Sequence, residues 1–250
     1  MCSRENDLRC GELGLQMNKR PNYCWVNAET IRFAFKEQIS LENRQLIHQF
    51  ERFIQQYLEG HIVETVSSYH TLTVFLRSSV QLHIERLLDE WVCFKKEEIH
   101  LSKGRINLPV CYDEEFALDM GRVMEATDLS AEEIIRIHSE RSYTVFLMGF
   151  LPGFPYLGVL DERLHVPRLQ VPRQLVVASS VGIGGAQTGI YPIDSPGGWN
   201  IIGRTPFQLF DVKREKPFLL APGDEIHFVK IDKGQFNELK KGGMEAWSLY

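Results

Sequence analysis

Three arginines lie in stiff segments, framed by proline and glycine, in the second half of the sequence. Arg168 and Arg173 each follow a proline, and Arg204 follows a glycine. Proline fixes one backbone angle and glycine permits unusual ones, so such segments hold their side chains in few conformations. Guanidinium groups suit bidentate recognition of a carboxylate or a phosphate. We therefore expect one anion-binding pocket that contains all three, against the alternative of solvated surface arginines.

The glycine-rich residues 182–191 are a second candidate for ligand contact. They contain no GxxxxGK[ST] motif, and Gln187 occupies the position at which GxGxxG requires its last glycine. Neither standard nucleotide-binding motif is therefore present. The pattern instead predicts tight β-turns. These turns would bring Gln187, Thr188 and Tyr191 to a shared surface, where we expect them to bind a ligand through hydrogen bonds.

Residues 149–158 read GFLPGFPYLG and carry three aromatic side chains among prolines and glycines. A loop that is ordered in advance loses little entropy on binding. Phe150, Phe154 and Tyr156 are therefore expected to form a docking surface for a ligand or a partner. The alternative is that these rings point inward and plug one end of a barrel, because large aromatic side chains are mostly buried.

Few other residues offer catalytic chemistry. His138 ends an expected helix and could serve as an acid–base group, although a histidine in this position also caps a helix or packs against its surroundings. Ser195 precedes a proline, which has no N–H for an oxyanion hole, so a serine nucleophile is not expected. The eight histidines and five cysteines show no metal-ligand spacing, and we predict no metal site.

The composition is that of a globular protein of 250 residues, 44% hydrophobic and 24% charged, with a net charge of −5. A chain with this charge is a poor partner for nucleic acid. No apolar run reaches the roughly 18 residues that a membrane span needs, and the first residues lack the apolar centre of a secretory signal. Scattered cysteines without a CxxC pair indicate a reducing compartment. We expect a cytoplasmic protein that binds neither nucleic acid nor membrane.

The first half of the chain reads as a small α+β domain over residues 23–98, after a flexible extension over residues 1–22. Alternating apolar residues predict three strands, near residues 31–35, 62–66 and 72–76. Ser40 can cap a helix that ends at Gly60, and a second helix contains Trp91. Strand–helix–strand–strand–helix is most of a ferredoxin-like split β-α-β unit.

The second half, residues 104–240, reads as a mainly-β domain. A strand at residues 106–111 is followed by two helices, and Ser130 with Glu133 has the spacing of a capping box at the start of the second one. Ten of the nineteen glycines and seven of the eleven prolines lie within residues 149–206, which is too many for a long helix. Short β-prone runs between them predict a closed or nearly closed β-barrel with long, rigid loops.

Several unusual segments occur together and in a fixed order. They are His138-Ser139, GFLPGFPYLG at 149–158, PRLQVPR at 167–173, SVGIGGAQTGIYP at 180–192, SPGGWNIIGRTP at 195–206 and LFD at 209–211. In these segments, and over about residues 28–232, the chain resembles the KipI / allophanate hydrolase subunit 1 family, which is the family of the 5-oxoprolinase subunit PxpB. Ser179 departs from the family pattern, in which this position is glycine. If that glycine has a positive φ, the serine strains the turn and alters the adjoining pocket.

The resemblance implies a small α+β domain followed by a cyclophilin-like β-barrel. It also implies a share in the ATP-dependent hydrolysis of 5-oxoproline to glutamate, with ATP as co-substrate. The implied partners are a PxpC/KipA-type subunit and a PxpA (LamB/YcsF-type) subunit. In that reaction we expect His138 and Arg173 to be catalytic, and Arg168, Arg204 and the polar residues within 182–191 to bind the substrate or its developing negative charge.

Two other functions stay open. The resemblance also implies a KipI-type inhibitor of a sensor histidine kinase, which Phe150, Phe154 and Tyr156 could dock. The older family name implies a role in allophanate or urea breakdown, as an allophanate hydrolase or urea carboxylase-related subunit. The sequence leaves the residues that bind ATP unassigned, and they can belong to the partner subunits.

Overall fold

The computed structural model describes residues 20–77, 81–94 and 105–247. The chain divides into two compact units, Met1–His100 and Leu101–Tyr250. The expected extension falls mostly outside the described residues, and so does most of the charged segment expected to separate the domains. Each unit has a hydrophobic core of its own.

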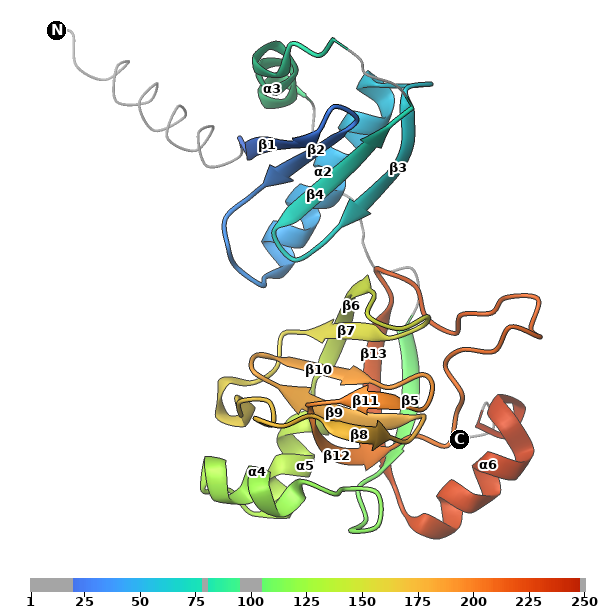
Figure 1. The fold of residues 1–250 in the computed structure, drawn as a ribbon. Helices are drawn as coiled ribbons and strands as arrows, with labels where there is room; N and C mark the ends of the chain where they lie inside the picture. Colours follow the sequence, from blue (N-terminus) through green and yellow to red (C-terminus); the bar gives the residue numbers. More distant parts are fainter. Residues whose placement is uncertain (1–19, 78–80, 95–104, 248–250) are drawn as a thin grey trace, which may run out of the picture. The chain divides into compact units, whose positions relative to one another are not determined.

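The first unit is a four-stranded antiparallel sheet with two helices (Figure 1). Its elements are β1 (Asn22–Asn27), β2 (Thr30–Ala34), α2 (Leu41–Tyr57), β3 (Ile62–Ser67), β4 (Thr71–Leu76) and α3 (Ile84–Cys93). In space the strands run β1-β2-β4-β3. The order from β2 to α3 is the expected strand–helix–strand–strand–helix pattern. β1 is an additional strand, and no apolar alternation marks it because all of its residues are exposed.

A side-chain cap and a cluster of aromatic rings fix the first unit. Ser40 Oγ accepts a hydrogen bond of 3.2 Å from the backbone N–H of Asn43, which starts α2 at the expected residue. On the buried face of α2, Phe50 packs edge-on against Phe33 of β2 and Trp91 of α3, with ring centroids 4.9 and 5.0 Å apart. The sheet and both helices therefore share one core.

The second unit is a closed seven-stranded barrel (Figure 1), as the glycine- and proline-rich sequence predicts. Its strands are β5 (Arg105–Cys111), β6 (Ser142–Met148), β7 (Pro155–Gly158), β9 (Ser180–Gly184), β10 (Gln187–Ile190), β12 (Asn200–Arg204) and β13 (Glu225–Ile231). Around the barrel they run β10-β7-β6-β13-β5-β12-β9. β13 lies parallel to β5 along its whole length, whereas the other neighbouring strands are antiparallel.

Further elements surround the barrel. They are α4 (Met120–Thr127), α5 (Ala131–Ser139), the 3₁₀ turn η1 (Glu162–Leu164), a separate two-stranded sheet of β8 (Arg173–Val176) and β11 (Ser195–Gly197), and α6 (Lys233–Trp247). Ser130 and Glu133 form the expected capping box of α5. α6 has no counterpart in the sequence-based prediction. Its Phe236 and Leu239 pack into the barrel core, but Gly243, with a φ of 68°, interrupts the helical pattern.

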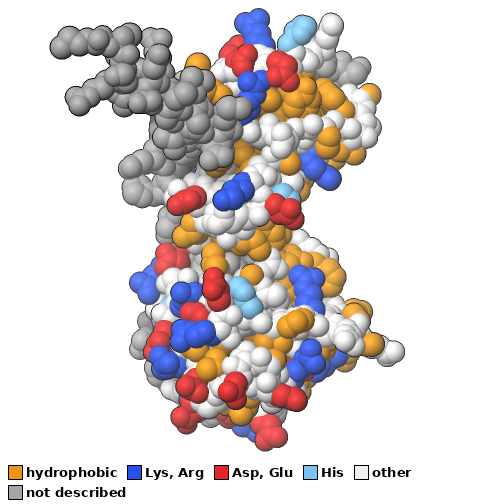
Figure 2. Space-filling model, turned by 90° about the vertical axis from the view of Figure 1, so that its left-hand side faces the viewer, with side chains coloured by type: hydrophobic (Ala, Val, Ile, Leu, Met, Phe, Trp, Pro, Cys, Tyr) orange, Lys and Arg blue, Asp and Glu red, His pale blue; other side chains and the backbone are white. Residues whose placement is uncertain are grey.

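On the face of the molecule drawn in Figure 2, basic and acidic side chains are interspersed, with hydrophobic side chains between them. Within the described ranges, no helix has both the length and the apolar character that a bilayer crossing requires. The same part of the chain contains no group of three or more histidine, cysteine, aspartate or glutamate side chains that could hold a metal ion.

Candidate functional site

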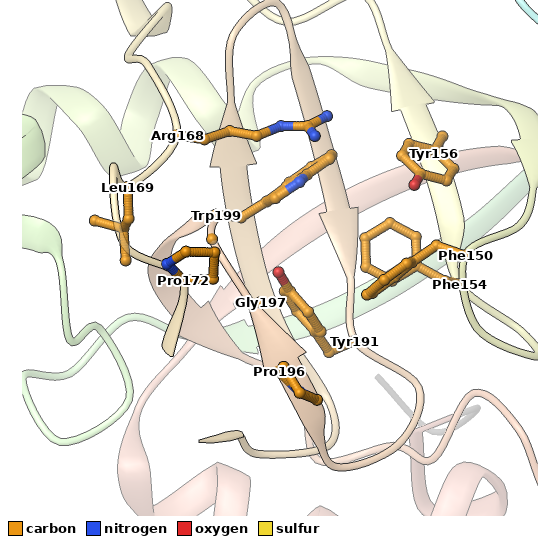
Figure 3. A pocket seen from close by; sticks show the side chains of 11 residues that line it. Phe150, Phe154, Tyr156, Arg168, Leu169, Pro172, Tyr191, Pro196, Gly197 and Trp199 are labelled. Carbon is orange, nitrogen blue, oxygen red and sulfur yellow. The ribbon is translucent and has the colours of Figure 1, made fainter. Parts of the chain in front are cut away.

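A cavity of about 340 Å³ lies in the second unit beside the β8–β11 sheet (Figure 3). Its described lining residues are Phe150, Phe154, Tyr156, Arg168, Leu169, Pro172, Tyr191, Pro196, Gly197, Gly198 and Trp199. They come mainly from residues 149–158, which end in β7, from the proline–arginine stretch at 167–173 and from residues 195–199, which begin with β11. Each of these segments contains at least one proline, which limits its backbone conformations, so the cavity is largely formed before any ligand binds.

Aromatic rings make one wall of this cavity. Phe154 lies at their centre, with its ring centroid 4.8 Å from that of Tyr156, 5.2 Å from that of Tyr191 and 5.5 Å from that of Trp199. The last two contacts are edge-to-face, the arrangement that aromatic quadrupoles favour. Because Phe154 is only 1% exposed, it supports the wall and presents little surface to a partner.

Phe150 behaves differently from its neighbours in the same loop. Its side chain is 64% exposed, and its backbone φ of 66° lies in the left-handed region that disfavours side chains other than glycine. Strained residues of this kind concentrate in binding loops, where the surrounding structure holds them. The sequence predicts either an exposed docking surface or inward-pointing rings, and each describes a different residue. Phe154 packs inward, and Phe150 remains at the surface beside the cavity.

Arg168 is the cation of the cavity. Its guanidinium carbon lies 5.2 Å from the centroid of the Trp199 ring, and the two side chains are stacked in Figure 3. A guanidinium over an indole is held by the ring quadrupole while its N–H groups stay available at the edge. No aspartate or glutamate is present among the described lining residues. The cavity therefore carries one positive charge that its own lining does not neutralise.

Two phenol groups complete the polar lining. Burial raises the pKa of Tyr191, and a hydrogen bond with the backbone of Trp199, together with the nearby Arg168, offsets part of this rise. Burial also raises the pKa of Tyr156, again with Arg168 acting in the opposite direction. Both hydroxyls are therefore protonated at neutral pH and able to donate hydrogen bonds. Aromatic walls, one cation and two donors suit a small, flat molecule with a single anionic group.

Arg173 does not join this cavity. It begins β8 and makes an ion pair with Asp119, at 2.5 Å between Nη2 and Oδ1. Asp119 Oδ2 accepts a second hydrogen bond, of 2.6 Å, from the backbone N–H of Ile201 in β12. The carboxylate thus ties the β8–β11 sheet to the barrel, and Arg173 has a structural partner in place of a ligand.

Arg204 also lies elsewhere, in a second cavity next to α6. Its Nε donates a hydrogen bond of 3.0 Å to the carbonyl oxygen of Ala178. The cavity of Arg168 and the cavity of Arg204 share no lining residue, and Arg173 lines neither. The single pocket of three arginines that the sequence predicts is therefore not formed. Spacing along the chain does not show which arginine faces a carboxylate from a distant segment.

His138 and Thr188 lie inside the barrel and form a closed hydrogen-bond chain. Thr188 Oγ1 donates to the carbonyl of Gly182 at 3.1 Å, so it accepts from His138 Nε2 at 2.9 Å. His138 Nδ1 then accepts from the Tyr112 hydroxyl at 2.9 Å. Burial lowers the pKa of His138 to about 3, which keeps the ring neutral. This position favours the packing role left open by the sequence over the acid–base role.

The buried, neutral His138 should make stability depend on pH. Its pKa falls from 6.5 to about 3 on folding. Between these values the unfolded chain binds a proton that the folded chain does not, so the free energy of unfolding should decrease as the pH falls below 6.5. This one group would contribute about 1.4 kcal/mol per pH unit, or about 2 kcal/mol between pH 6.5 and pH 5.

Urea unfolding at pH 7 and pH 5 would measure this effect. Carboxylates also titrate in this range, so the informative quantity is the difference between the native chain and His138→Gln. His138→Gln should be less stable at pH 7 but should lose less stability on going to pH 5. His61→Gln, which changes an exposed histidine, is the control and should behave as the native chain. Equal pH dependence in all three proteins would contradict the prediction.

Of the remaining residues expected to contact a ligand, some line the cavity of Arg168 and others do not. Tyr191, Phe150 and Tyr156 line the cavity, whereas Gln187 is buried on β10 and lines neither of the two cavities. Trp199 is not among the residues that the sequence singles out, although it carries Arg168 on its ring. The signal for it is a tryptophan directly after two glycines, a place where a large side chain is fixed by a short, well-defined turn.

Comparison with known proteins gives the family. Residues 21–220 match the model of the carboxyltransferase domain, subdomain C and D. The 5-oxoprolinase B subunit of Escherichia coli O157:H7 is 43% identical over 216 residues, which are 84% of this chain and 97% of that protein. The chain belongs to the family of 5-oxoprolinase B subunits. The family member of Bacillus subtilis strain 168 is 35% identical over 227 residues, or 86% of this chain and 94% of that protein.

Two solved structures are similar to this chain. A conserved uncharacterized protein from Pyrococcus horikoshii is 37% identical, with a TM-score of 0.53 over 83% of this chain and 96% of that one. Kluyveromyces lactis urea carboxylase matches 88% of this chain with a TM-score of 0.72, at 17% identity. This chain spans only 22% of that enzyme, and the likeness concerns the fold alone.

Proposed function

We propose that this chain is a subunit of an ATP-dependent 5-oxoprolinase, which hydrolyses 5-oxo-L-proline to L-glutamate. The proposal is supported by the identity of 35 to 43% with 5-oxoprolinase B subunits over most of their length. The observation that carries it for this chain is the cavity of Arg168, Trp199 and Tyr191. We also propose the two partner subunits, of the PxpC/KipA and PxpA types, and a cytoplasmic location.

The chemistry of the cavity fits this substrate. 5-Oxoproline is a five-membered lactam ring with one carboxylate. Its carboxylate would pair with the guanidinium of Arg168, and its ring would pack against the aromatic wall around Phe154. The hydroxyls of Tyr156 and Tyr191 would then donate hydrogen bonds to the lactam oxygen, which gains negative charge when the ring opens. This chain would bind and orient the substrate, while ATP, its co-substrate, would be bound with the partner subunits.

The fold is part of the proposal. We assign the first unit to the ferredoxin-like class and the barrel to the cyclophilin-like class, with the domains at residues 23–98 and 104–240. A cyclophilin-like barrel does not by itself imply prolyl isomerisation, because function depends on the site and not on the fold. The kinase-inhibitor function gains nothing from the geometry, since Phe154, one of its three expected docking residues, is buried.

Reconstitution would test the proposal. The chain is co-expressed with its two proposed partners, and the release of glutamate and phosphate from 5-oxoproline and ATP is measured. Turnover is expected only when all three subunits are present. A complete set of folded subunits without turnover would overturn the assignment. Calorimetry would also measure whether the isolated chain binds 5-oxoproline. Binding is expected if this chain holds the substrate itself, and no binding is expected if it only completes the pocket of a partner subunit.

Gly197 offers a sharp test of the cavity itself. A Cβ atom at this position would lie 2.3 Å from the hydroxyl oxygen of Tyr191, far below contact distance, so Gly197→Ala must displace the tyrosine. At the adjacent Gly198 the nearest atom would be 3.6 Å away, an ordinary contact. We expect Gly197→Ala to lower kcat/KM of the reconstituted enzyme about tenfold or more, which corresponds to about 1.4 kcal/mol, and Gly198→Ala to change it less than twofold.

The two glycine variants form a matched pair, because both residues line the same cavity. Thermal unfolding of each isolated variant shows whether the fold survives the substitution. If Gly197→Ala binds and turns over 5-oxoproline as the native chain does, then this cavity is not the substrate site. The family assignment would stand in that case, and the substrate would bind elsewhere in the complex.

A further inference from the structure

A second cavity of about 380 Å³ lies between the end of β12, the residues that follow it and one face of α6. Its described lining residues are Ala178, Ser179, Arg204, Thr205, Pro206, Phe207, Gln208, Arg214, Phe236, Leu239, Lys240 and Gly243. Three of these side chains are cationic, and no described lining residue is acidic. The proposed 5-oxoprolinase role makes no use of this cavity.

A hydrogen bond fixes Arg204, and a helix packed on the barrel core carries Lys240. Arg204 is fixed on β12 by its bond to the Ala178 carbonyl at 3.0 Å. Lys240 lies one helical turn after Phe236, and both Phe236 and Leu239 are buried in the barrel core. Because the core anchors this face of α6, Lys240 is directed to the same side as the cavity. Two of the three cations, Arg204 and Lys240, are therefore carried by regular elements that pack on the barrel.

Two carboxylates lie close to these cations. Asp194 accepts a hydrogen bond of 2.7 Å from the backbone N–H of Ala178. Asp211 accepts one of 2.9 Å from the backbone N–H of Lys213 and lies 3.8 Å from Arg214, at the limit of an ion pair. Burial lowers the pKa of Arg204, and the nearby carboxylate of Asp194 offsets part of this effect. Like charges around one cavity repel each other until an anion enters.

The turn that carries Ser179 adds a hydroxyl and backbone strain. Ser179 has a φ of 70°, in the left-handed region, and its Oγ donates a hydrogen bond of 2.8 Å to the Phe207 carbonyl. The positive φ on which the expected strain depends is therefore present, and the strained residue lies on this cavity. A serine in this conformation is held by its surroundings, and such residues concentrate at ligand sites.

We propose that this cavity binds phosphate, either as inorganic phosphate or as the terminal phosphate of a nucleotide. The two guanidinium groups and the ammonium group outnumber the two carboxylates beside them, Asp194 and Asp211, and they suit an anionic phosphate group. Thr205 lines the same cavity, and its hydroxyl accepts a hydrogen bond from the backbone N–H of Phe207, so its own proton can be donated to a phosphate oxygen. The site is separate from the cavity of Arg168 and does not depend on the identity of the substrate bound there.

Calorimetric titration of the isolated chain with inorganic phosphate, at constant ionic strength in chloride, would test the site. Saturable binding of one phosphate is expected in the native chain. Lys240→Gln should weaken this binding about tenfold, and Arg204→Lys should weaken it by a similar factor because the planar fork is lost. Lys241→Gln is the matched control: Lys241 is exposed, neighbours Lys240 on the same helix and does not line the cavity.

Parallel titrations with ATP, ADP and adenosine would distinguish the two sources of phosphate. Tighter binding of ATP than of inorganic phosphate, lost in Lys240→Gln, would identify a nucleotide. Binding of inorganic phosphate alone would identify a free anion. The proposal is overturned if neither binds saturably, or if Lys240→Gln and Arg204→Lys bind as tightly as Lys241→Gln. The reconstituted enzyme activity is a separate readout, so failure here leaves the proposed function untouched.

Discussion

Replacing Arg168 with alanine is expected to lower kcat/KM for 5-oxoproline in the reconstituted enzyme about 10- to 100-fold. Arg168 is the one cation among the described residues of the aromatic cavity, and its guanidinium is held over Trp199 at 5.2 Å. A hydrogen bond to a charged group contributes about 1.5–3 kcal/mol, and each 1.4 kcal/mol corresponds to a factor of ten. Steady-state kinetics at saturating ATP would measure the loss.

The partition of this effect between the two kinetic constants is informative. The carboxylate of 5-oxoproline keeps its charge during the reaction, so Arg168 should bind it equally in the ground state and the transition state. The loss should therefore appear mainly as a higher KM, with kcat nearly unchanged. Arg168→Lys should lie between the native chain and Arg168→Ala, because a lysine keeps the charge but loses the planar contact with the indole.

Arg163→Ala is the matched control for Arg168→Ala. Arg163 is 58% exposed, pairs with Asp161 and does not line the cavity. It should change kcat/KM less than twofold. Native kinetics in Arg168→Ala would remove Arg168 from the substrate site and would favour a cavity that serves only as a structural support.

Replacing Asp119 with alanine is expected to destabilise the second unit by about 3–5 kcal/mol. This carboxylate is 5% exposed and accepts hydrogen bonds from both Arg173 and the backbone N–H of Ile201. Its removal leaves a partly buried guanidinium without its partner, and Nη1 of the same arginine already has no hydrogen-bond partner in the described structure. Breaking such a pair from one side costs more than the pair contributes, because the remaining charge is uncompensated.

Chemical unfolding of Asp119→Ala, Arg173→Ala and the double variant would give the coupling between the two side chains. We expect Arg173→Ala to cost less than Asp119→Ala, and the double variant to cost less than the sum of the single variants. Glu114→Ala changes an exposed carboxylate in the same segment and should alter stability by less than about 0.5 kcal/mol. Additive effects would show that the contact between Asp119 and Arg173 contributes little.

Local sequence signals account for much of the fold. The hydroxyl caps at Ser40 and Ser130 place the first turns of α2 and α5 correctly, because a cap is decided within four residues. Alternating apolar residues locate β2, β3 and β4. β1 and α6 escape prediction for opposite reasons. Every residue of β1 is exposed, so no buried face leaves a pattern, and in α6 Gly243 interrupts the helical pattern.

The candidate site is predictable only in part. Loops rich in glycine and proline identify the segments that line the cavity, because stiffness is a property of the local sequence. Partners across the chain are not local. Asp119 and Arg173 are 54 residues apart, and His138 and Thr188 are 50 residues apart. No spacing rule shows that Asp119 neutralises Arg173, which the sequence predicts to bind an anion. Nor does one show that His138, the expected acid–base group, is buried inside the barrel with Thr188 as its hydrogen-bond partner.

The parallel pairing of β5 with β13 has a consequence for how the protein is made. These two strands are the first and the last of the barrel. More than a hundred residues must be synthesised after β5 before β13 is available to close the barrel. Until then β5 and β6 each lack a neighbour that β13 supplies, and open strand edges invite association with other nascent chains. Premature termination before Glu225 should therefore yield aggregates and not a smaller folded domain.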